Sequence, residues 1–321
     1  MKTLANYTEL IENALRDFNL PQQPANLYEP LNYFLKLGGK RMRPILTLLA
    51  AEAFGKQAKD GLQAALAVEL FHNFSLIHDD IMDAAPLRRG QQTVHEKWNA
   101  NIAILSGDVL LVKAYQCLAN YEPATFQKLF TVFNQTAIEV CEGQQYDMDF
   151  EQRDDVTEAA YIEMIRLKTS VLLGCALELG AIIGGADTIA AQQIYRFGEQ
   201  LGLAFQIQDD LLDLFGTEAQ VGKQIGGDVL ANKKTLLSIS AKSLANPSQR
   251  AVLDQIALLE NDAEKIAQTQ KIYHELGAKS YCESKMNVFH QEALKALDQI
   301  ESQHSKVAFY DLAEFLLNRA H

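Results

Sequence analysis

The chain has 321 residues, 48% of them hydrophobic, and a formal net charge of −12. A chain of this length and apolar content can bury a substantial core, which excludes an intrinsically disordered protein. The acidic balance argues against a nucleic acid or an anionic membrane surface as the main partner, because both bind clustered lysine and arginine.

The first 18 residues, "MKTLANYTELIENALRDF", have the pattern of an amphipathic helix and lack the continuous apolar core of a signal peptide. No later run reaches the roughly 18 uncharged residues of a membrane span. The four cysteines are scattered and show no CxxC spacing, as expected in a reducing compartment. We therefore expect a cytoplasmic protein without stable membrane insertion.

Apolar residues recur at helical spacing along most of the chain, as in "LTLLAAEAF" at 46–54, while period-two stretches are hard to find. Breaks in the pattern fall at 20–27, 37–44, 84–93, 121–124, 184–187, 216–232 and 246–248. None of them is long enough to be an interdomain linker. The sequence predicts an all-α fold, in which residues 1–321 form a single domain, a large bundle of about ten or more helices.

The first chemical signal along the chain is "GGKRMRP", which places Lys40, Arg41 and Arg43 after a double glycine at the start of a helix. Flexible backbone, a helix start and positive charge together favour an anion site. On its own such a cluster is typical of a solvated loop.

The next signal is "FSLIHDDIMD" at 74–83, where Asp79, Asp80 and Asp83 end an otherwise apolar run. Asp79 and Asp83 are four residues apart and lie on one face of a helix, where they repel each other. An isolated DxxxD pair is typical of a solvated acidic face, but the apolar approach favours partly buried carboxylates that need a cation. "PLRRG" follows, and we expect Arg88 and Arg89 to bind phosphate oxygens.

A second copy of the spacing, "FQIQDDLLDLFG", contains Asp209, Asp210 and Asp213. Hard oxygen ligands on rigid helices favour Mg²⁺, which completes its coordination with water and substrate phosphate. The Gly-rich segment that follows supplies Lys223, Lys233 and Lys234. Cations beside two aspartate clusters predict a diphosphate bridged by metal, although the segment alone is typical of a mobile loop.

These motifs, together with "GQQYDMD" and "RLKTS", occur in an order that resembles the trans-type isoprenyl diphosphate synthases, the polyprenyl synthetase family that includes farnesyl and geranylgeranyl diphosphate synthases. The resemblance covers residues 35–235. It implies an isoprenoid synthase-like homodimer with a central cavity, which binds isopentenyl diphosphate and an allylic diphosphate of C5, C10 or C15 with three Mg²⁺ ions.

The resemblance also implies roles for individual residues. The metal ligands are Asp79, Asp83 and Asp209, supported by Asp80, Asp210 and Asp213. Isopentenyl diphosphate is held by Lys40, Arg43, His72 and Arg89, and the allylic diphosphate by Arg88, Lys168, Lys223 and Lys233, with Thr169 and Gln206 near the reacting carbons. A lone histidine on an apolar helix is otherwise typical of a core residue, so His72 is assigned by the resemblance alone. Arg41 and Lys234 are interpreted as supporting charge.

Product length is expected to depend on the helix that leads into Asp79. Phe74 and Phe71 lie five and eight residues before Asp79 and can form the floor of the cavity, although both could be ordinary core aromatics. Ser75 is small where animal-type farnesyl synthases have an aromatic residue. The pattern favours a C20 product, with C15 next.

Three alternatives remain open at this stage. A class I terpene cyclase shares metal-driven ionisation but lacks "GGKRMRP" and usually has one aspartate-rich motif. A non-catalytic regulatory subunit tends to lose one aspartate cluster. A helical scaffold leaves the basic motifs unexplained.

Overall fold

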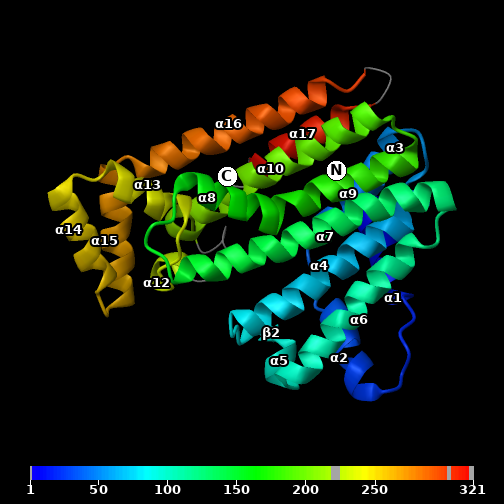
Figure 1. Ribbon diagram of the computed structural model, residues 1–321, viewed down its shortest axis with the longest axis horizontal. Helices are drawn as coiled ribbons and strands as arrows, with labels where there is room; N and C mark the ends of the chain where they lie inside the picture. The colour runs from blue at the N-terminus through cyan, green and yellow to red at the C-terminus, as the bar shows by residue number, and fades with distance from the viewer. Residues whose placement is uncertain (1, 218–224, 302–304, 318–321) are drawn as a thin grey trace. The chain divides into compact units, whose positions relative to one another are not determined.

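A computed structural model of the protein describes residues 2–217, 225–301 and 305–317 (Figure 1). These residues are almost entirely helical, and the only strands among them are β1 (Leu87–Arg88) and β2 (Gln91–Gln92). The predicted all-α fold is therefore confirmed.

Contacts between Cα atoms divide the chain into two compact units. The described residues of the first unit lie within 1–135, 175–195 and 301–305, and those of the second within 136–174, 196–300 and 306–321. The single domain 1–321 stays a prediction.

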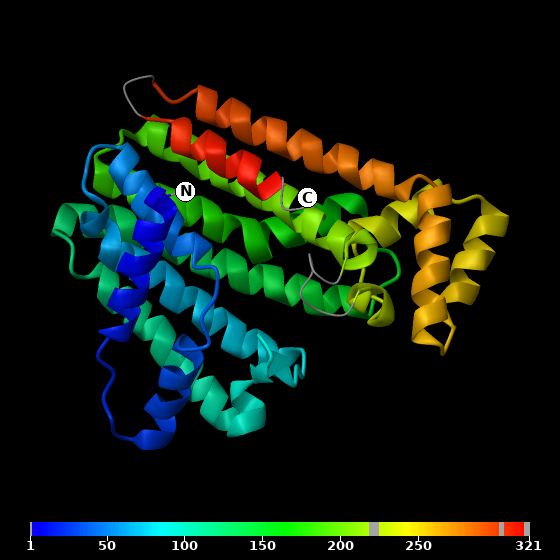
Figure 2. The ribbon, with the colours of Figure 1, turned by 180° about the vertical axis from the view of Figure 1, so that it is seen from behind.

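The first unit is built around α4 (Leu62–Met82), which packs against α3 (Met42–Ala53) and α6 (Ala100–Leu118). Gly107 on α6 allows a close approach to α4, because a Cβ there would lie 2.3 Å from Nε2 of His78. Both views of the ribbon show α4 and α6 side by side (Figures 1 and 2). The unit also contains α1 (Lys2–Arg16), α2 (Ala25–Leu35), the 3₁₀ helix η1 (Ala58–Gly61), α5 (Val94–Lys97) and the start of α7 (Pro123–Glu151).

Part of α9 (Val171–Gly184) and the start of α10 (Thr188–Phe215) also belong to the first unit. Two glycines fit α9 closely against α3. A Cβ on Gly180 would lie 2.2 Å from the carbonyl oxygen of Thr47, and one on Gly184 would lie 2.4 Å from Cβ of Phe54. A larger side chain at either position would push the helices apart.

The second unit contains the remaining parts of α7, α9 and α10 and the C-terminal helices. Its core includes Tyr161, Ile207, Leu236 and Cys282. Its other elements are α8 (Glu158–Ile165), the π-helix η2 (Arg166–Ser170), α12 (Gly227–Leu230), α13 (Leu236–Leu244), α14 (Pro247–Ala257), α15 (Asp262–Glu275), α16 (Ala278–Asp298) and α17 (Val307–Leu317). Asn246 and Asn261 cap α14 and α15 by accepting hydrogen bonds from backbone N–H groups of the first turn.

Two helical stretches of the described residues, Ala100–Leu118 and Glu158–Gly184, are long and apolar enough to cross a membrane by length and composition alone. The protein buries 78% of the apolar window in Glu158–Gly184, as is typical of a core helix, but only 39% of the window in α6. The outer face of α6 is therefore unusually apolar.

The carboxyl group of Glu178 lies in the apolar run of α9, where burial raises its pKa from the ordinary 4.5 to about 7. The unfolded chain therefore loses this proton at lower pH than the folded one, so stability falls as pH rises from 4.5 to 7. We expect Glu178→Gln to stabilise the protein at pH 8 by up to about 3 kcal/mol and to have little effect below about pH 4. Urea unfolding at the two pH values measures the difference, and equal stabilisation at both would contradict this origin.

Candidate active site

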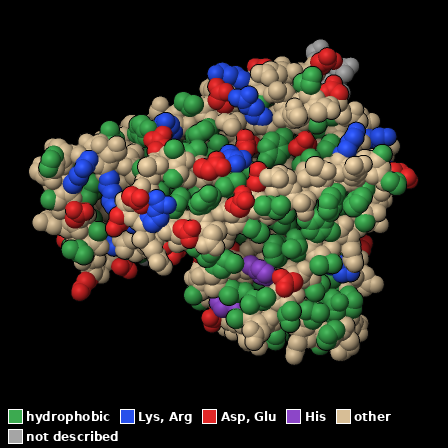
Figure 3. Space-filling model, viewed as in Figure 1, with side chains coloured by type: hydrophobic (Ala, Val, Ile, Leu, Met, Phe, Trp, Pro, Cys, Tyr) green, Lys and Arg blue, Asp and Glu red, His purple; other side chains and the backbone are tan. Residues whose placement is uncertain are grey.

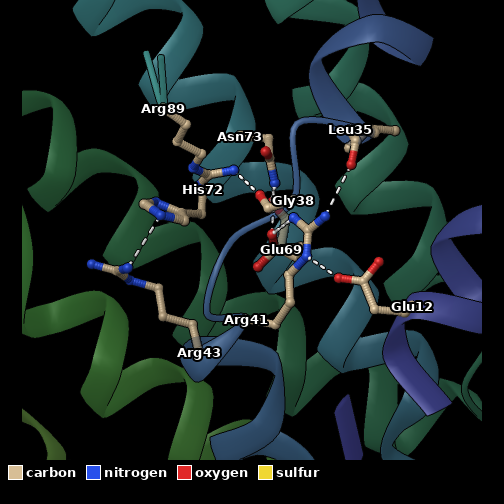
Figure 4. Close-up of polar contacts among 9 residues, drawn as sticks. All are labelled: Glu12, Leu35, Gly38, Arg41, Arg43, Glu69, His72, Asn73 and Arg89. Atoms are coloured by element: carbon tan, nitrogen blue, oxygen red, sulfur yellow. Dashed lines mark hydrogen bonds and ion pairs between the residues drawn. The ribbon is translucent and has the colours of Figure 1, made fainter. Parts of the chain in front are cut away.

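The loop before α3 is held by the side chain of Arg41, which is only 4% exposed (Figure 4). Its guanidinium group donates to Glu69 Oε1 at 2.5 Å, to Glu12 Oε1 at 2.8 Å and to the carbonyl oxygen of Leu35 at 2.9 Å. Asn73 donates to the same Glu69 oxygen at 2.9 Å. Arg41, interpreted from the sequence as supporting charge for a substrate, is thus paired within the protein and anchors the loop.

The backbone of this loop is left-handed at several positions, with φ of 74° at Gly38, 142° at Gly39 and 48° at Arg41. Glycine adopts such angles without steric cost, whereas an arginine needs compensating contacts. The buried ion pairs of Arg41 supply them. Lys40 lies between Gly39 and Arg41, so the ion pairs that anchor Arg41 also fix the backbone of Lys40.

The predicted break at 84–93 contains a small antiparallel hairpin, in which Leu87 is opposite Gln92 and Arg88 is opposite Gln91. The two turn residues, Arg89 and Gly90, have φ of 53° and 75°, as in the turns that match the twist of a two-residue hairpin. Strands of two residues are too short to give a period-two pattern, so the sequence did not predict them.

Arg89 reaches back from this hairpin to the glycine loop, where its guanidinium group donates to the carbonyl oxygen of Gly38. The guanidinium group packs against Gly39, where a Cβ would lie 2.9 Å from Nη2 of Arg89, and the φ of 142° at this position favours glycine. The structure thus brings Arg89 beside the loop that carries Lys40.

Arg43 and His72 complete this cationic cluster (Figure 4). Arg43 Nη1 lies 3.2 Å from His72 Nε2, and because arginine only donates, Nε2 is the acceptor. Burial and the charges of Arg43 and Arg89 lower the pKa of His72 well below its ordinary value. His72 is therefore neutral, and its pairing with Arg43 orients both side chains.

The first aspartate motif ends α4 and contains one buried carboxylate. Asp80 is 1% exposed and accepts from Arg88 Nε at 2.8 and 2.9 Å, with Arg88 Nη2 at 2.7 Å. Burial raises the pKa of Asp80, and the Arg88 charge opposes that shift. Asp79 is partly exposed and Asp83 is exposed one turn later. The motif therefore leaves Asp83 exposed and Asp79 partly exposed, while Asp80 is fixed inward.

The second motif, on α10, buries two of its three aspartates, Asp210 and Asp213, with different partners. Asp210 accepts from the hydroxyl of Tyr161 and from Gln206 Nε2, the latter at 3.2 Å. Burial raises the pKa of Asp210 to about 8, and the charge of Asp228 adds to this shift. Asp213 is 2% exposed, and its Oδ2 accepts from the backbone N–H of Asp228 at 3.0 Å.

Asp209 is the half-buried member of the second motif. The structure thus separates one accessible aspartate from two that are built into the fold.

The π-helix η2 carries Lys168 and Thr169. Glycines from α7 and α10 pack against it, since a Cβ on Gly143 would lie 2.2 Å from the backbone N of Lys168 and one on Gly202 2.8 Å from Cα of Ser170. Lys168 Nζ lies 2.6 Å from Asp147 Oδ2. π-helical turns are frequent at functional sites because they re-aim side chains out of the regular helix.

Several predicted residues of the second unit meet in one small cavity of about 120 Å³. Thr169 Oγ1 donates to Gln206 Oε1 at 3.3 Å, and Lys168 and Lys233 line the same cavity. Lys223 lies outside the described residues. Lys234 is paired with Asp154 at 3.3 Å.

The aromatic residues before Asp79 belong to a larger cluster of the first unit. The ring centroids of Phe71 and Phe74 are 5.5 Å apart, Phe71 lies 5.4 Å from Phe133 of α7, and Phe74 lies 4.7 Å from His78. Ser75 donates to the carbonyl oxygen of His72 at 2.9 Å. The sequence had not pointed to Phe133, because it lies 54 residues from Asp79 and outside the "GQQYDMD" motif of its helix.

The carboxylates of the two aspartate motifs are hard oxygen ligands, which Mg²⁺ prefers. Within the described ranges, no group of three or more His, Cys, Asp or Glu side chains forms a ready-made metal site. Mg²⁺ is usually bound by one or two carboxylates together with substrate phosphates, and does not need a protein cage. Asp79 with Asp83, and Asp209 separately, are carboxylates of that kind.

Comparisons with known proteins agree with this chemistry. The family model described as polyprenyl synthetase matches residues 24–276. The chain is 37% identical to a geranylgeranyl diphosphate synthase of Methanosarcina mazei, over 98% of this chain and 97% of the relative. A crystal structure of a geranylgeranyl pyrophosphate synthase superimposes with a TM-score of 0.92 at 42% identity, covering 100% of this chain and 99% of the other.

A third similar protein was solved with ligands. The polyprenyl synthase from Caulobacter crescentus, described as complexed with calcium and isoprenyl diphosphate, has a TM-score of 0.85 and is 26% identical. The match covers 100% of this chain and 95% of that one.

Arg41 neutralises buried carboxylate charge, so its removal has a large predicted cost. We expect Arg41→Met to destabilise the protein by about 3–5 kcal/mol, because Glu69 would keep a buried charge without its partner. Glu12 is the matched control, since its side chain is 39% exposed, and Glu12→Gln should cost about 1 kcal/mol or less. Urea unfolding of the two variants tests this, and equal losses would contradict a buried anchoring role for Arg41.

Proposed function

Because the chain belongs to the polyprenyl synthetase family, we propose that the residues described above perform the family reaction on two diphosphates. The protein condenses isopentenyl diphosphate with an allylic diphosphate and makes a short all-trans prenyl diphosphate, C20 in the first place. The observation that carries this proposal is the cluster of Arg43, His72 and Arg89 in the same unit as Asp79 and Asp83. It provides cations for a second diphosphate besides the one that the aspartates bind through metal.

The reaction begins with ionisation of the allylic substrate. Polyprenyl synthases depend on Mg²⁺, which when bound draws negative charge from the allylic diphosphate, and we propose three such ions at Asp79, Asp83 and Asp209. The C1–O bond breaks and its electron pair leaves with pyrophosphate. The double bond of isopentenyl diphosphate then attacks the allylic C1 cation, forming a C–C bond, and a proton is lost to the released pyrophosphate.

The protein's own side chains hold the two substrates. Lys40, Arg43 and Arg89 bind isopentenyl diphosphate, and neutral His72 keeps the guanidinium group of Arg43 oriented through the 3.2 Å contact. His72 therefore adds no further charge to a site that already has three cations.

The allylic diphosphate is assigned to Arg88, Lys168, Lys223 and Lys233. Arg88 fixes Asp80 with Nε and Nη2, and a guanidinium group has five N–H donors, so phosphate can be bound as well. Thr169 and Gln206, which bond to each other, line the same cavity as Lys168 and Lys233. Their dipoles can stabilise positive charge on the reacting carbons.

We also propose that the protein is a homodimer through the outer face of α6. Ile104, Leu105 and Val112 of this helix are 42%, 58% and 57% exposed, and Phe130 of α7 is 40% exposed. Figure 3 shows apolar side chains gathered over this region of the surface. Several exposed apolar side chains on neighbouring helices are typical of a subunit interface. All four cysteines are free thiols, which is compatible with a cytoplasmic location.

Turnover by the purified chain tests the function directly. We expect condensation of isopentenyl diphosphate with C5, C10 and C15 starters in the presence of Mg²⁺, and loss of turnover when the metal is chelated. A terpene cyclase would consume the allylic diphosphate without isopentenyl diphosphate. A non-catalytic regulatory subunit would show no turnover until an active partner is added, and either outcome would overturn the proposal.

Product length is predicted to depend on the aromatic floor. Phe74→Ala removes a ring that packs against Phe71 and His78, so we expect products longer than C20, more so in the Phe71→Ala/Phe74→Ala double variant. Phe309→Ala is the control, because Phe309 is a buried aromatic that packs on Phe197 in the second unit. Product chromatography measures the chain length, and unchanged length in both floor variants would show that these rings do not limit it.

A further inference from the structure

Helix α15 lies beside the segment that follows the second aspartate motif, although it contains none of the residues predicted to act on a substrate. Three of its residues contact that segment or the end of α10, and they do so by different means. They are Lys265, Ile266 and Gln270. These contacts give the helix a place beside the second aspartate motif.

Lys265 is 6% exposed, and its ammonium group donates to Asn232 Oδ1 at 3.1 Å. Among the described residues it has no carboxylate partner within ion-pair distance. Burying an ammonium group against a neutral amide costs free energy, and a methionine would fill similar volume without that cost. The lysine is therefore not explained by packing alone.

Asn232 holds the turn that presents Lys233. Its φ of 51° is left-handed, and its backbone N–H donates to the carbonyl oxygen of Val229 at 3.2 Å. The backbone N–H of Lys233 then donates to the carbonyl oxygen of Asp228 at 2.9 Å. Since the position of Lys233 follows from the turn at Asn232, the bond from Lys265 restrains it.

Two further contacts fix the surroundings of this turn against the same helix. Gly226 has a φ of 78°, and a Cβ there would lie 2.7 Å from Cγ1 of Ile266. Gln270 Nε2 donates to the carbonyl oxygen of Leu214 at 2.5 Å. Helix α15 therefore contacts the end of α10, the start of α12 and the turn after α12.

We propose that Lys265 is a positioning residue for the allylic diphosphate: through Asn232 it places Lys233 in the cavity that Lys168, Thr169 and Gln206 also line. This inference rests on the proposed function, in which Lys233 binds that diphosphate. Lys265 itself acts through the turn and does not touch the substrate.

The first test compares three variants in steady-state kinetics with farnesyl diphosphate and isopentenyl diphosphate. For Lys265→Met we expect the KM for farnesyl diphosphate to rise about fivefold to tenfold, the loss expected for one hydrogen bond of typical net strength. The KM for isopentenyl diphosphate should stay within about twofold, because its cluster uses no contact of this turn. Lys265→Arg keeps a donor and should restore most of the affinity. Lys271→Met, an exposed lysine on the same helix, is the matched control and should behave as the unmodified protein.

A double-mutant cycle identifies the contact. Asn232→Gly accepts the left-handed turn without strain but removes the amide acceptor. If the proposal holds, Lys265→Met has little further effect in the Asn232→Gly background. Additive effects, or equal increases in both KM values, would overturn it.

Lys233→Ala separates this inference from the proposed function. If Lys233→Ala leaves the KM for farnesyl diphosphate unchanged, the assignment of Lys233 fails. If Lys233→Ala raises that KM but Lys265→Met does not, only the positioning role fails.

Discussion

The site depends on how the protein holds three aspartates within five residues without losing the helix that carries them. In each motif the middle carboxylate is buried and hydrogen-bonded by other side chains, Asp80 by Arg88 and Asp210 by Tyr161 and Gln206. The two solutions differ electrostatically, because Arg88 brings a positive charge while Tyr161 and Gln206 bring only dipoles. The raised pKa of Asp210 fits the weaker partners. Fixing one carboxylate inward reduces the repulsion and leaves its neighbours oriented for a cation.

The cationic residues of the first unit are arranged in a similar way, since one of them, Arg41, is buried and paired while others stay near the surface of the fold. Arg41 is paired inside the fold with Glu69 and Glu12, and these ion pairs offset the strain of its own left-handed backbone. Arg43 and Arg89 then occupy fixed positions beside it. A buried ion pair is a poor source of net stability, but breaking one is expensive, so such pairs hold a loop in one conformation.

The sequence predicted the helical class, both aspartate motifs and most of the cations, because each has a local signature of period, spacing or composition. It did not predict Tyr161, Glu12 or Lys265, since each contributes through one long-range contact that leaves no periodic trace. Glu69 could have been found as the single charge in the apolar run before His72. The strands beside Arg89 were too short for any pattern, and their only signal was the Arg-Gly pair at the turn.

The π-helix at Arg166–Ser170 has a consequence for how the chain can change. The backbone N–H of Val171 bonds to the carbonyl oxygen of Arg166, five residues back, so this turn contains one residue more than a regular α-turn. One residue corresponds to about 100° of rotation about the helix axis. The extra residue therefore changes the direction in which the side chains of Arg166–Ser170 point relative to those of the apolar helix that begins at Val171. Here the number of residues matters more than their identity. Deleting Ser170 would leave all other residues in the same order, yet would turn Lys168 and Thr169 by about 100° relative to the apolar run that follows.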